Sequence, residues 1–450
     1  MPTPLASYWR QYAARATAGG QQVENRLRHK IRSTTMLFSV AGQSLDSLDL
    51  KVLLVTKGLK VSLDVYDQFG LTGRIHPDPR ACNCVILPDG TIVHVTDVAL
   101  HMRYLKGAVL LESLRNVRHA LGMRTPFRLV VSARGTPVIL YENEEVTEVG
   151  LPPASRFYEQ RTSSGLPYLG NAVLQGVDFL SFQCLWPCDY AKAGYSCQFC
   201  YSGGVFERLA RRGKPAPVIP THRDIAEIVD YAVNREAAAG HLQLTGGSTL
   251  NPQAECHLIG AILGEIDHVV GLESIPGEVL VYTTPPADPR AIDQVFDAGA
   301  DRVACSLEVW DEALAEITTP GKWKFAGRRR YLECLEYVAG KYGPNRACSS
   351  FVVGLEPAES FLEGAEYLAA RGIVPIASIW IPFGKPVMGN MKPPGLDFYR
   401  QIKQGLARIY VKYGIEPPGS AGLNVCACRD IWNHRTEIIE GAERPCFAGQ

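Results

Sequence analysis

The chain has 450 residues, of which 46% are hydrophobic and 20% are charged, as in ordinary globular proteins. Lysine plus arginine and aspartate plus glutamate both number 46, so the net charge is zero, which argues against a broad surface for nucleic acid or for an anionic membrane. Neither a secretory signal nor an uncharged apolar run of about 18 residues is visible. We therefore expect a cytoplasmic protein that binds neither nucleic acid nor membrane.

The first 150 residues predict an N-terminal α+β or mostly β domain. Residues 1–35 are polar and helix-like, and short β-rich runs follow at 51–55, 60–66, 83–95 and 127–142. Asp89-Gly90 lies between two alternating apolar runs, which is typical of a β-hairpin. A turn-rich connector over 151–175 then predicts a domain boundary.

From residue 176 the pattern changes to short apolar runs that alternate with longer amphipathic stretches. The predicted helices include 221–240, where Thr221 is placed to cap the first turn, and 288–300. The predicted strands span 177–184, 241–247, 278–284, 301–310, 348–356 and 373–382. Strand–helix alternation of this kind indicates a parallel sheet. The fold class is therefore α/β, with a partial (βα)6 TIM-like barrel over 176–390 and a C-terminal extension over 391–450.

Four cysteines gather at the end of the first predicted barrel strand: Cys184, Cys188, Cys197 and Cys200. Barrel enzymes place their chemistry at the carboxyl ends of the strands. Three thiolates from one loop are able to hold a [4Fe–4S] cluster and leave one iron open. The same four cysteines could instead form two ligand pairs for a structural zinc ion, or be ordinary buried thiols. A disulfide framework is disfavoured for a chain without an export signal.

Other cysteines offer further candidate sites. Cys426 and Cys428 are candidates for an auxiliary metal centre near the barrel mouth. Cys82 and Cys84 form a second C-x-C pair. For either pair, the alternative is that the two cysteines are simply alternate residues of a β-strand. The usual D-x-H-x-x-G signature of cobalamin domains is missing, although another mode of cobalamin binding stays open. Hydrolase and nucleotide-hydrolase motifs are missing too.

The cysteine pattern resembles that of the radical S-adenosylmethionine (radical SAM) superfamily, in the branch of biotin synthase and its relatives. The common motif is C-x3-C-x-Φ-C, where Φ is aromatic. Here Phe199 precedes Cys200, and eight residues lie between Cys188 and Cys197. The motif is therefore an atypical C-x8-C-x-F-C. The resemblance covers about 176–385. It implies cluster ligation by Cys188, Cys197 and Cys200, with Cys184 as the fallback first ligand.

The resemblance also implies a set of cofactor contacts at the strand ends. A glycine-rich segment after the second strand would bind the methionyl amino group, because glycine lets backbone carbonyls come close to a ligand. Residues near the ends of the fourth, fifth and sixth strands would contact the rest of the nucleotide. The residues that match are Phe199, Gly246, Gly247, Ser248, Thr249, Ser306, Glu308, Gly354 and Ile379.

The expected activity follows from that resemblance. A [4Fe–4S] cluster, reduced by an electron donor such as ferredoxin or flavodoxin, would cleave S-adenosylmethionine and start hydrogen abstraction from a small-molecule or peptide substrate. Methyl or other group transfer to a peptide or cofactor precursor is one expected outcome, alongside sulfur insertion and rearrangement. The competing hypothesis is a zinc-stapled α/β scaffold protein without radical chemistry.

Overall fold

The structure, a computed structural model, describes residues 36–70, 72–76, 81–95, 125–185, 187–200, 209, 211, 213, 218–381, 387–388, 391–420 and 425–443. The helices predicted within residues 1–35 lie outside these ranges. Among the helices of the described residues, none has both the length and the apolar character needed to cross a membrane.

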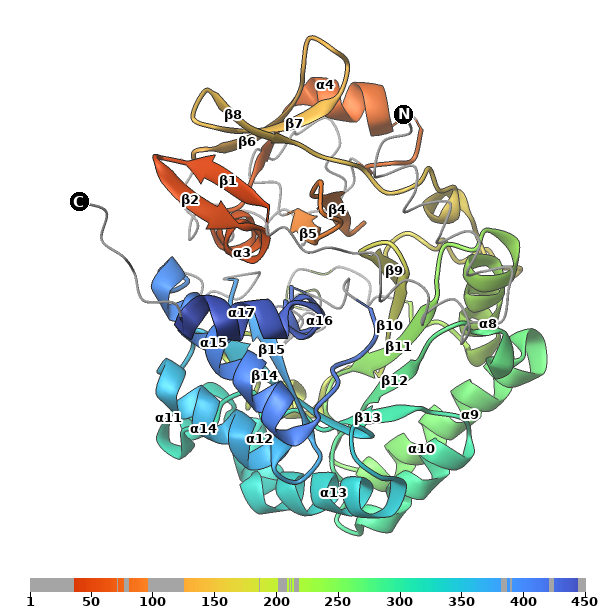
Figure 1. The fold of residues 1–450 in the computed structure, drawn as a ribbon. Helices are drawn as coiled ribbons and strands as arrows, with labels where there is room; N and C mark the ends of the chain where they lie inside the picture. The colour runs from red at the N-terminus through yellow and green to blue at the C-terminus, as the bar shows by residue number, and fades with distance from the viewer. Residues whose placement is uncertain are drawn as a thin grey trace.

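A curled seven-stranded sheet forms the body of the molecule, with the strand order β15-β14-β13-β12-β11-β10-β9 (Figure 1). Neighbouring strands from β10 to β15 are parallel, and β9 runs antiparallel at the edge. The bounds are β9 (Ala172–Gln175), β10 (Phe179–Leu185), β11 (His241–Gly246), β12 (Val279–Tyr282), β13 (Arg302–Ala304), β14 (Ala347–Val353) and β15 (Val374–Ile379). The predicted partial α/β barrel and its six strands are confirmed.

Helices cover the outer face of this half-barrel, because alternate strand residues are apolar and need burial on that side. Leu242 and Leu244 of β11 are fully buried in the main core, whereas Gln243 between them accepts a hydrogen bond from Ser181 Oγ at 2.7 Å. The covering helices are α8 (His222–Asp230), α9 (Pro252–Val270), α10 (Asp293–Asp297), α13 (Gly327–Tyr342), α14 (Ala358–Ala369) and α15 (Leu396–Tyr413). The opposite, concave face carries polar side chains such as Gln243 and Ser181 beside apolar ones such as Leu280.

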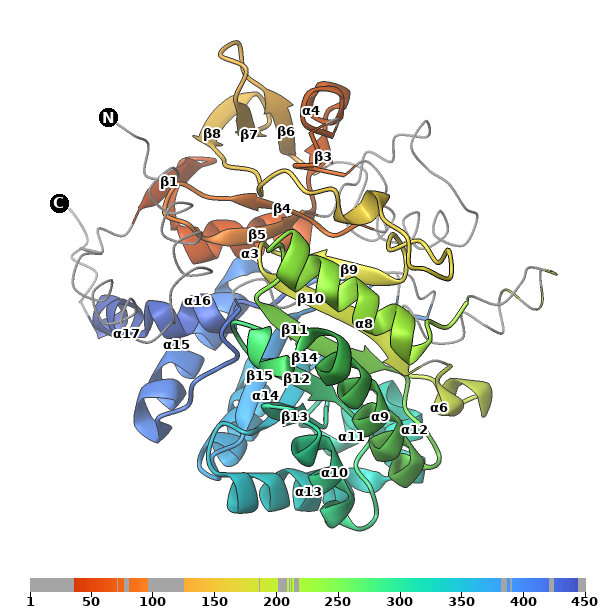
Figure 2. The same ribbon diagram turned by 90° about the vertical axis from the view of Figure 1, so that its right-hand side faces the viewer.

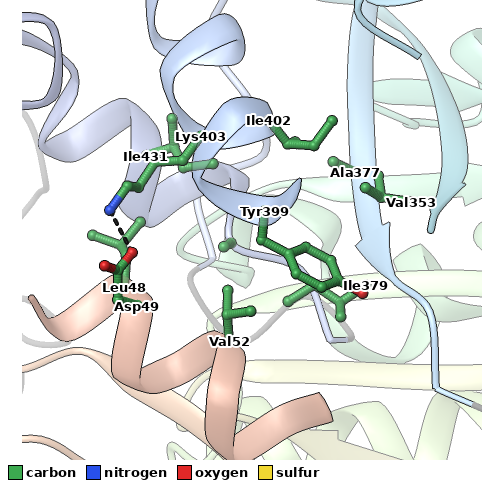
Figure 3. A pocket seen from close by; sticks show the side chains of 11 residues that line it. Leu48, Asp49, Val52, Val353, Ala377, Ile379, Tyr399, Ile402, Lys403 and Ile431 are labelled. Carbon is green, nitrogen blue, oxygen red and sulfur yellow. Dashed lines mark hydrogen bonds and ion pairs between the residues drawn. The ribbon is translucent and has the colours of Figure 1, made fainter. Parts of the chain in front are cut away.

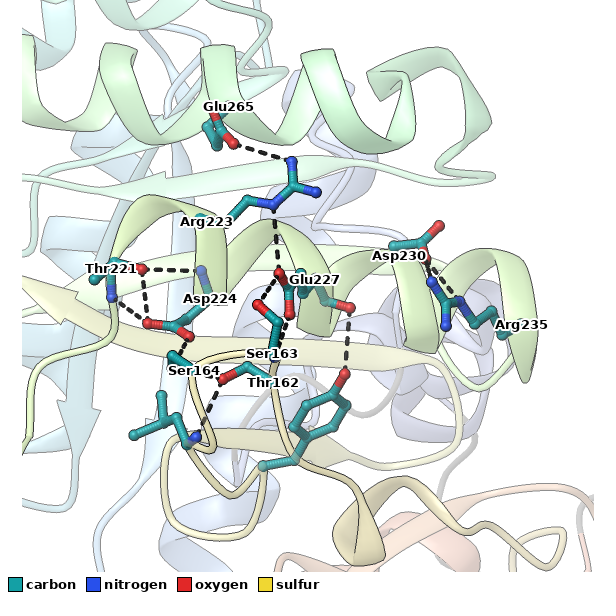
Figure 4. A network of polar contacts seen from close by, with 12 residues as sticks. Thr162, Ser163, Ser164, Thr221, Arg223, Asp224, Glu227, Asp230, Arg235 and Glu265 are labelled. Carbon is teal, nitrogen blue, oxygen red and sulfur yellow. Dashed lines mark hydrogen bonds and ion pairs between the residues drawn. The ribbon is translucent and has the colours of Figure 1, made fainter.

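The connector before the barrel is held against α8 by polar contacts (Figure 4). Thr221 caps α8 in a reciprocal capping box with Asp224, as the sequence predicts. Asp224 also accepts a hydrogen bond from Ser164 Oγ at 2.6 Å, and Glu227 accepts from Ser163 N and Oγ, each at 2.7 Å. Burial alone would raise the pKa of Asp224, but these hydroxyl and amide donors outweigh it and lower the pKa to about 2. After α8 the chain continues as a π-helical turn, Tyr231–Arg235.

The N-terminal region forms small sheets and one long helix above the barrel. The hairpin predicted around Asp89-Gly90 is confirmed, with Cys84 paired to His94. The four-stranded sheet has the order β3-β6-β7-β8. The bounds are β1 (Leu37–Val40), β2 (Gln43–Asp46), α3 (Ser47–Lys57), β3 (Lys60–Val61), α4 (Leu63–Val65), β4 (Asn83–Ile86), β5 (Ile92–Val95), β6 (Phe127–Val131), β7 (Pro137–Tyr141) and β8 (Glu144–Glu148).

Two β predictions in this region are wrong. Residues 51–55 lie within helix α3, which starts where the Asp46 side chain accepts a hydrogen bond from Asp49 N. The helix is buried on nearly all sides, so its apolar run lacks the helical period that would have identified it. In the run 60–66 only Lys60–Val61 is strand, and the remainder coils into α4 and a π-helical turn, Tyr66–Gly70.

Helix α3 ties the N-terminal region to the last barrel strand and to the C-terminal helices. Lys51 Nζ forms a buried ion pair with Asp430 of α16 (Cys428–Asn433), and Lys403 of α15 contacts Asp49 at 2.7 Å. Apolar residues from both regions belong to one continuous core cluster. Figure 1 accordingly shows α3 above β15, α15 and α16, with α17 (Arg435–Glu443) beside them.

A small apolar cavity lies at this junction (Figure 3). Its lining residues come from α3, β14, β15, α15 and α16, and include Val52, Val353, Ile379 and Tyr399. The Tyr399 hydroxyl is buried and has no hydrogen-bond partner among the described residues. The cavity belongs to the helix side of the sheet.

Candidate functional site

The site is built around the cysteine loop, which we define as residues 188–200, directly after β10. Cys188 precedes the single-turn helix α6 (Asp189–Lys192), and the chain then returns to Cys197 and Cys200. All three cysteines are partly exposed, and none of the described cysteines forms a disulfide. The amide of Cys200 donates to the Cys197 carbonyl at 3.3 Å, which keeps the last two together.

The glycine-rich segment after β11 packs directly against this loop. A Cβ atom on Gly247 would lie only 2.4 Å from Cys188 Cα and 2.7 Å from Cys188 N, so no larger residue fits there. The amide of Asp189 donates to the Ser248 carbonyl at 2.8 Å, and Thr249 Oγ1 donates to Asp189 Oδ2 at 3.0 Å. The structure therefore brings the predicted segment Gly246, Gly247, Ser248 and Thr249 to the predicted first ligand, Cys188.

A buried carboxylate, which the sequence analysis did not single out, supports that segment from behind. Glu255 of α9 accepts hydrogen bonds from Thr284 N and from Thr283 Oγ1, each at 2.7 Å. Thr284 Oγ1 in turn accepts from the amide of Thr249 at 3.1 Å. Burial raises the pKa of Glu255 to about 7 although these donors oppose the shift. A carboxylate at a buried position of the apolar face of α9 is the signal that would have identified it.

Glu308 lies beyond the fourth strand and not within it, which corrects the strand predicted over 301–310. The β13 ladder ends at Ala304, and Glu308 has a left-handed backbone, with φ of 71°. It rejoins β14 through two hydrogen bonds, from its amide to Ser350 O and from Val352 N to its carbonyl, each at 2.9 Å. The predicted alternation of Ser306 and Glu308 along a continuous strand is therefore wrong.

Lys322 pairs with Glu308 and is the main site residue that the sequence analysis missed. Its Nζ lies 2.6 Å from Glu308 Oε1 and donates to the Ser306 carbonyl at 2.7 Å. Burial alone would lower the pKa of Lys322, but the charges of Glu308 and Cys197 raise it. Nothing in the local sequence signals this pair, because Lys322 belongs to α12 (Pro320–Phe325), a separate helix.

The Cys197 thiol shares this electrostatic environment. Burial raises its pKa, the Lys322 ammonium lowers it, and the charges of Cys200, Glu308 and Cys188 raise it again. Lys322, Cys200, Glu308 and Cys188 are therefore all near enough to Cys197 to influence its pKa. A cationic side chain beside thiols favours thiolate character when a metal is bound.

Phe199 and Gly354 lie at the edge of the site, whereas the Ile379 side chain lies away from it. Phe199 packs on a small cluster formed by Val309, Ala315, Leu355 and Trp380. Gly354 has φ of 114°, and a Cβ there would lie 2.9 Å from Pro394 Cδ, so glycine is needed for both reasons. Ile379 precedes Trp380 and points to the opposite face, into the cavity of Figure 3. Its side chain is thus not brought to the cysteines.

Two helices pack against the outer side of the cysteine loop. The amide of Gln198 donates to the Thr318 carbonyl of α11 (Glu312–Thr318) at 2.8 Å. A Cβ on Gly321 would lie 2.5 Å from Tyr195 O, so α12 touches the loop backbone. The Phe325 ring lies 5.0 Å from that of Tyr190 and 5.5 Å from that of Tyr195.

The remaining candidate cysteines lie elsewhere. Cys184 Sγ points to the Thr245 carbonyl at 3.7 Å, and burial raises its pKa to about 12. Cys426 and Cys428 are buried where the chain pairs with β15, with Ala377 N 3.1 Å from Cys428 Sγ. The hydrogen bonds described for these thiols go to Thr245, to Ala377 and between Cys426 and Cys428.

In the N-terminal region Cys82 and Cys84 are on the same face of a hairpin with His94. Cys82 Sγ lies 2.9 Å from His94 Nδ1. Burial raises the pKa of Cys82 to about 12 and lowers that of His94 to about 4, so this pair is neutral near pH 7. Across the described ranges, no three or more His, Cys, Asp or Glu side chains surround a point that could hold a single metal ion.

The donor chemistry of the cysteine loop fits an iron–sulfur cluster. It provides three thiols from one loop, and iron–sulfur clusters are held by cysteine thiolates. A structural zinc ion needs four ligands, and the fourth cysteine, Cys184, is directed to a backbone carbonyl instead.

Comparison with known proteins relates the half-barrel to a known family. Residues 192–373 match the family model described as "Radical SAM superfamily". The bacteriochlorophyllide c C-7(1)-hydroxylase of Chlorobaculum limnaeum is 26% identical over 299 residues, which span 64% of this chain and 73% of that protein.

Solved structures with a similar arrangement include two radical SAM or maturase proteins. A radical SAM methyltransferase from Sphaerobacter thermophilus is 14% identical with a TM-score of 0.36, over 72% of this chain and 88% of that one. The FeFe-hydrogenase maturase HydG from Carboxydothermus hydrogenoformans is 17% identical with a TM-score of 0.35, over 54% of this chain and 53% of that one. The chain thus spans about half the length of HydG.

Proposed function

This chain carries a radical SAM domain, and we propose that Cys188, Cys197 and Cys200 hold its [4Fe–4S] cluster while the neighbouring strand ends hold S-adenosylmethionine. The observation that supports this assignment best is the contact of Gly247 with Cys188, which brings the glycine-rich segment to the cysteine loop. When bound, the cluster and S-adenosylmethionine supply a carbon radical that removes a hydrogen atom from the substrate.

The residues around the cysteines have separate tasks in this proposal. The open backbone of Gly246 and Gly247 would accept hydrogen bonds from the methionyl ammonium. Glu308 and Lys322 would contact the polar groups of the same ligand, the carboxylate accepting from hydroxyls or ammonium and the ammonium donating to a carboxylate. Phe199 and Trp380 would exclude water from the reacting atoms.

The substrate would enter from the concave side of the half-barrel. That side carries hydrogen-bonding groups in its middle, such as Gln243 with Ser181, and the Tyr282 hydroxyl 3.0 Å from Ser350 Oγ. These groups suit a substrate with polar substituents near the carbon that loses hydrogen.

For the outcome we favour hydroxylation of an alkyl carbon, on the strength of the hydroxylase relative. Overall, a C–H bond, water and S-adenosylmethionine would give an alcohol, methionine, 5′-deoxyadenosine and a proton, with no net gain or loss of electrons. Group transfer to a peptide or cofactor precursor is the second candidate. The zinc-stapled scaffold is not favoured, because residues 192–373 match the radical SAM family model.

The test is anaerobic purification followed by incubation with S-adenosylmethionine and dithionite. We expect brown protein that contains iron and sulfide, and formation of 5′-deoxyadenosine that stops when Cys197 is replaced by alanine. Transfer of deuterium from a labelled tetrapyrrole into 5′-deoxyadenosine would support the hydroxylase-like substrate class. Colourless protein that holds about one zinc ion per chain would contradict the proposal.

A further inference from the structure

A basic segment covers the outer side of the cysteine loop. Residues 320–331 contain Lys322, Lys324, Arg328, Arg329 and Arg330 and no acidic residue, although the whole chain has zero net charge. The segment comprises α12 and the first turn of α13. The charge is therefore a local feature and does not follow from composition.

Folding alone does not explain this charge. Three arginines occupy the first turn of α13, where the positive end of the helix dipole disfavours cations. Arg328 is partly compensated, because its guanidinium lies 3.6 Å from the Trp310 ring. Arg329 is 90% exposed and forms an ion pair with Glu333, with Nε 3.5 Å from Oε1.

The two lysines of α12 point to opposite sides of the loop. Lys322 points inward to Glu308, as described above. Lys324 is exposed, and its Nζ lies over the Tyr195 ring, 3.8 Å from the centroid. Tyr195 is two residues from Cys197 in sequence, so this exposed charge lies directly on the cysteine loop.

Further basic residues extend the same surface. Lys192 of α6 is 49% exposed and pairs with Asp189 at 3.0 Å. Arg330 is close enough for its charge to lower the pKa of Tyr190, which burial raises. Figure 2 shows α6 and α12 at the same edge of the barrel. Three acidic groups at this edge, Asp189, Glu312 and Glu333, are each paired with a basic side chain.

We propose that this surface, formed by Lys192, Lys324, Arg329 and Arg330, is the docking site for a small acidic protein that carries single electrons. The inference rests on the proposed function, since the group held by the cysteine loop must receive one electron from outside. In that step the carrier is oxidised by one electron and the bound group is reduced by one. Charge complementarity between a basic and an acidic surface speeds encounter and fixes orientation.

A substrate is a poorer match for this surface. Tyr190, Tyr195 and Phe325 pack between it and the concave side of the barrel, where the strand ends converge. An exposed surface of basic and aromatic side chains suits the rim of a protein–protein contact better than it suits the mostly apolar lining of a small-molecule pocket.

The first experiment measures binding and does not depend on turnover. Anaerobic calorimetry would titrate the purified protein with a flavodoxin and, separately, with an acidic [2Fe–2S] ferredoxin, at low and high salt. We expect saturable binding of at least one carrier that weakens with salt. The charge-reversal pair Lys324→Glu with Arg329→Glu should weaken it about tenfold or more, as expected for lost charge complementarity.

The matched control reverses one lysine and one arginine elsewhere. Lys57→Glu with Arg134→Glu changes the charge by the same amount on exposed positions of the N-terminal region and should leave affinity within about twofold. Arg329→Glu alone is a control for damage to the cysteine loop, because the Arg329 side chain is 90% exposed and pairs with Glu333 of its own helix. It should still weaken binding severalfold.

The second experiment separates docking from chemistry. With flavodoxin as reductant, formation of 5′-deoxyadenosine by Lys324→Glu/Arg329→Glu should fall about tenfold, whereas the rate with dithionite should stay at the wild-type value. Loss of the dithionite reaction in wild-type protein, with carrier binding intact, would overturn the proposed function and leave the docking surface standing. Absence of salt-sensitive carrier binding, equal weakening by the control pair, or tighter binding of a polynucleotide to the same residues would overturn the docking surface.

Discussion

Lys322 Nζ lies 2.6 Å from Glu308 Oε1, and both side chains are largely buried, at 13% and 16% exposure. The pair joins α12 to the end of the fourth barrel strand and faces Cys197. Because each charge is withdrawn from water, each needs the other, and the loss of one partner leaves the other uncompensated.

Replacing Lys322 with methionine should therefore destabilise the protein by about 3 kcal/mol, and should also weaken binding of S-adenosylmethionine at least tenfold. The double variant Lys322→Met/Glu308→Gln should recover much of the stability but not the affinity. Urea unfolding and equilibrium dialysis measure the two quantities. If the single and double variants were equally stable, the two side chains would not be coupled.

Gly247 provides a sharp steric test of the glycine-rich segment. In Gly247→Ala the new methyl group would meet the backbone of Cys188 at less than 3 Å, and backbone cannot move aside easily. We expect iron content after anaerobic reconstitution to fall severalfold, because the first ligand is displaced. Gly264→Ala in α9 is the control, since a Cβ there meets nothing within 4 Å and alanine favours helix by about 1 kcal/mol. Full iron content in Gly247→Ala would contradict the assignment of Cys188.

Cysteine substitutions should distinguish the ligands of the cluster from the buried thiols of the core. Cys188→Ser, Cys197→Ser and Cys200→Ser should each lose most of the bound iron, since thiolate ligation is removed. Cys184→Ser and Cys426→Ser should keep it, because both thiols are buried away from the loop. Iron and sulfide analysis, together with the visible spectrum, provides the measurement. Loss of iron in Cys184→Ser with retention in Cys188→Ser would make Cys184 the first ligand.

The barrel could be predicted from the sequence because its strands repeat one local pattern, a short apolar run followed by an amphipathic helix. The capping residue Thr221 and the hairpin at Asp89-Gly90 are local in the same sense. Residues 51–55 could not be recognised as helical, since a helix that is buried on nearly all sides has no polar face to reveal the helical period. Burial overrides the local signal there.

The candidate site shows the same distinction between residues with a local sequence signal and residues without one. The cysteines and the glycine-rich segment carry motifs, so the sequence could place them, and the structure brings Gly247 to Cys188. Lys322 and Glu255 carry no motif, because their partners are distant in sequence and are chosen by packing. The basic segment carries no motif either, and its position over Tyr195 emerges from the fold alone.

Glu255 predicts a pH dependence of stability. Its pKa is about 7 in the folded protein and about 4.5 in the unfolded chain, because burial disfavours the carboxylate. The folded state therefore holds a proton more tightly than the unfolded state between these values. Stability contributed by this group falls as pH rises from about 4.5 to 7 and stays low above pH 7, a loss of about 3 kcal/mol at most.

Replacing Glu255 with glutamine should remove that slope, because an amide does not titrate. We expect the free energy of unfolding of Glu255→Gln, relative to wild type, to rise by about 2–3 kcal/mol between pH 5 and pH 8. Urea unfolding of the anaerobically purified proteins at four pH values measures it. Glu333→Gln, at a side chain that is 55% exposed, should follow the wild-type profile. Parallel profiles for wild type and Glu255→Gln would mean that Thr283 and Thr284 hold the carboxylate ionised throughout this range.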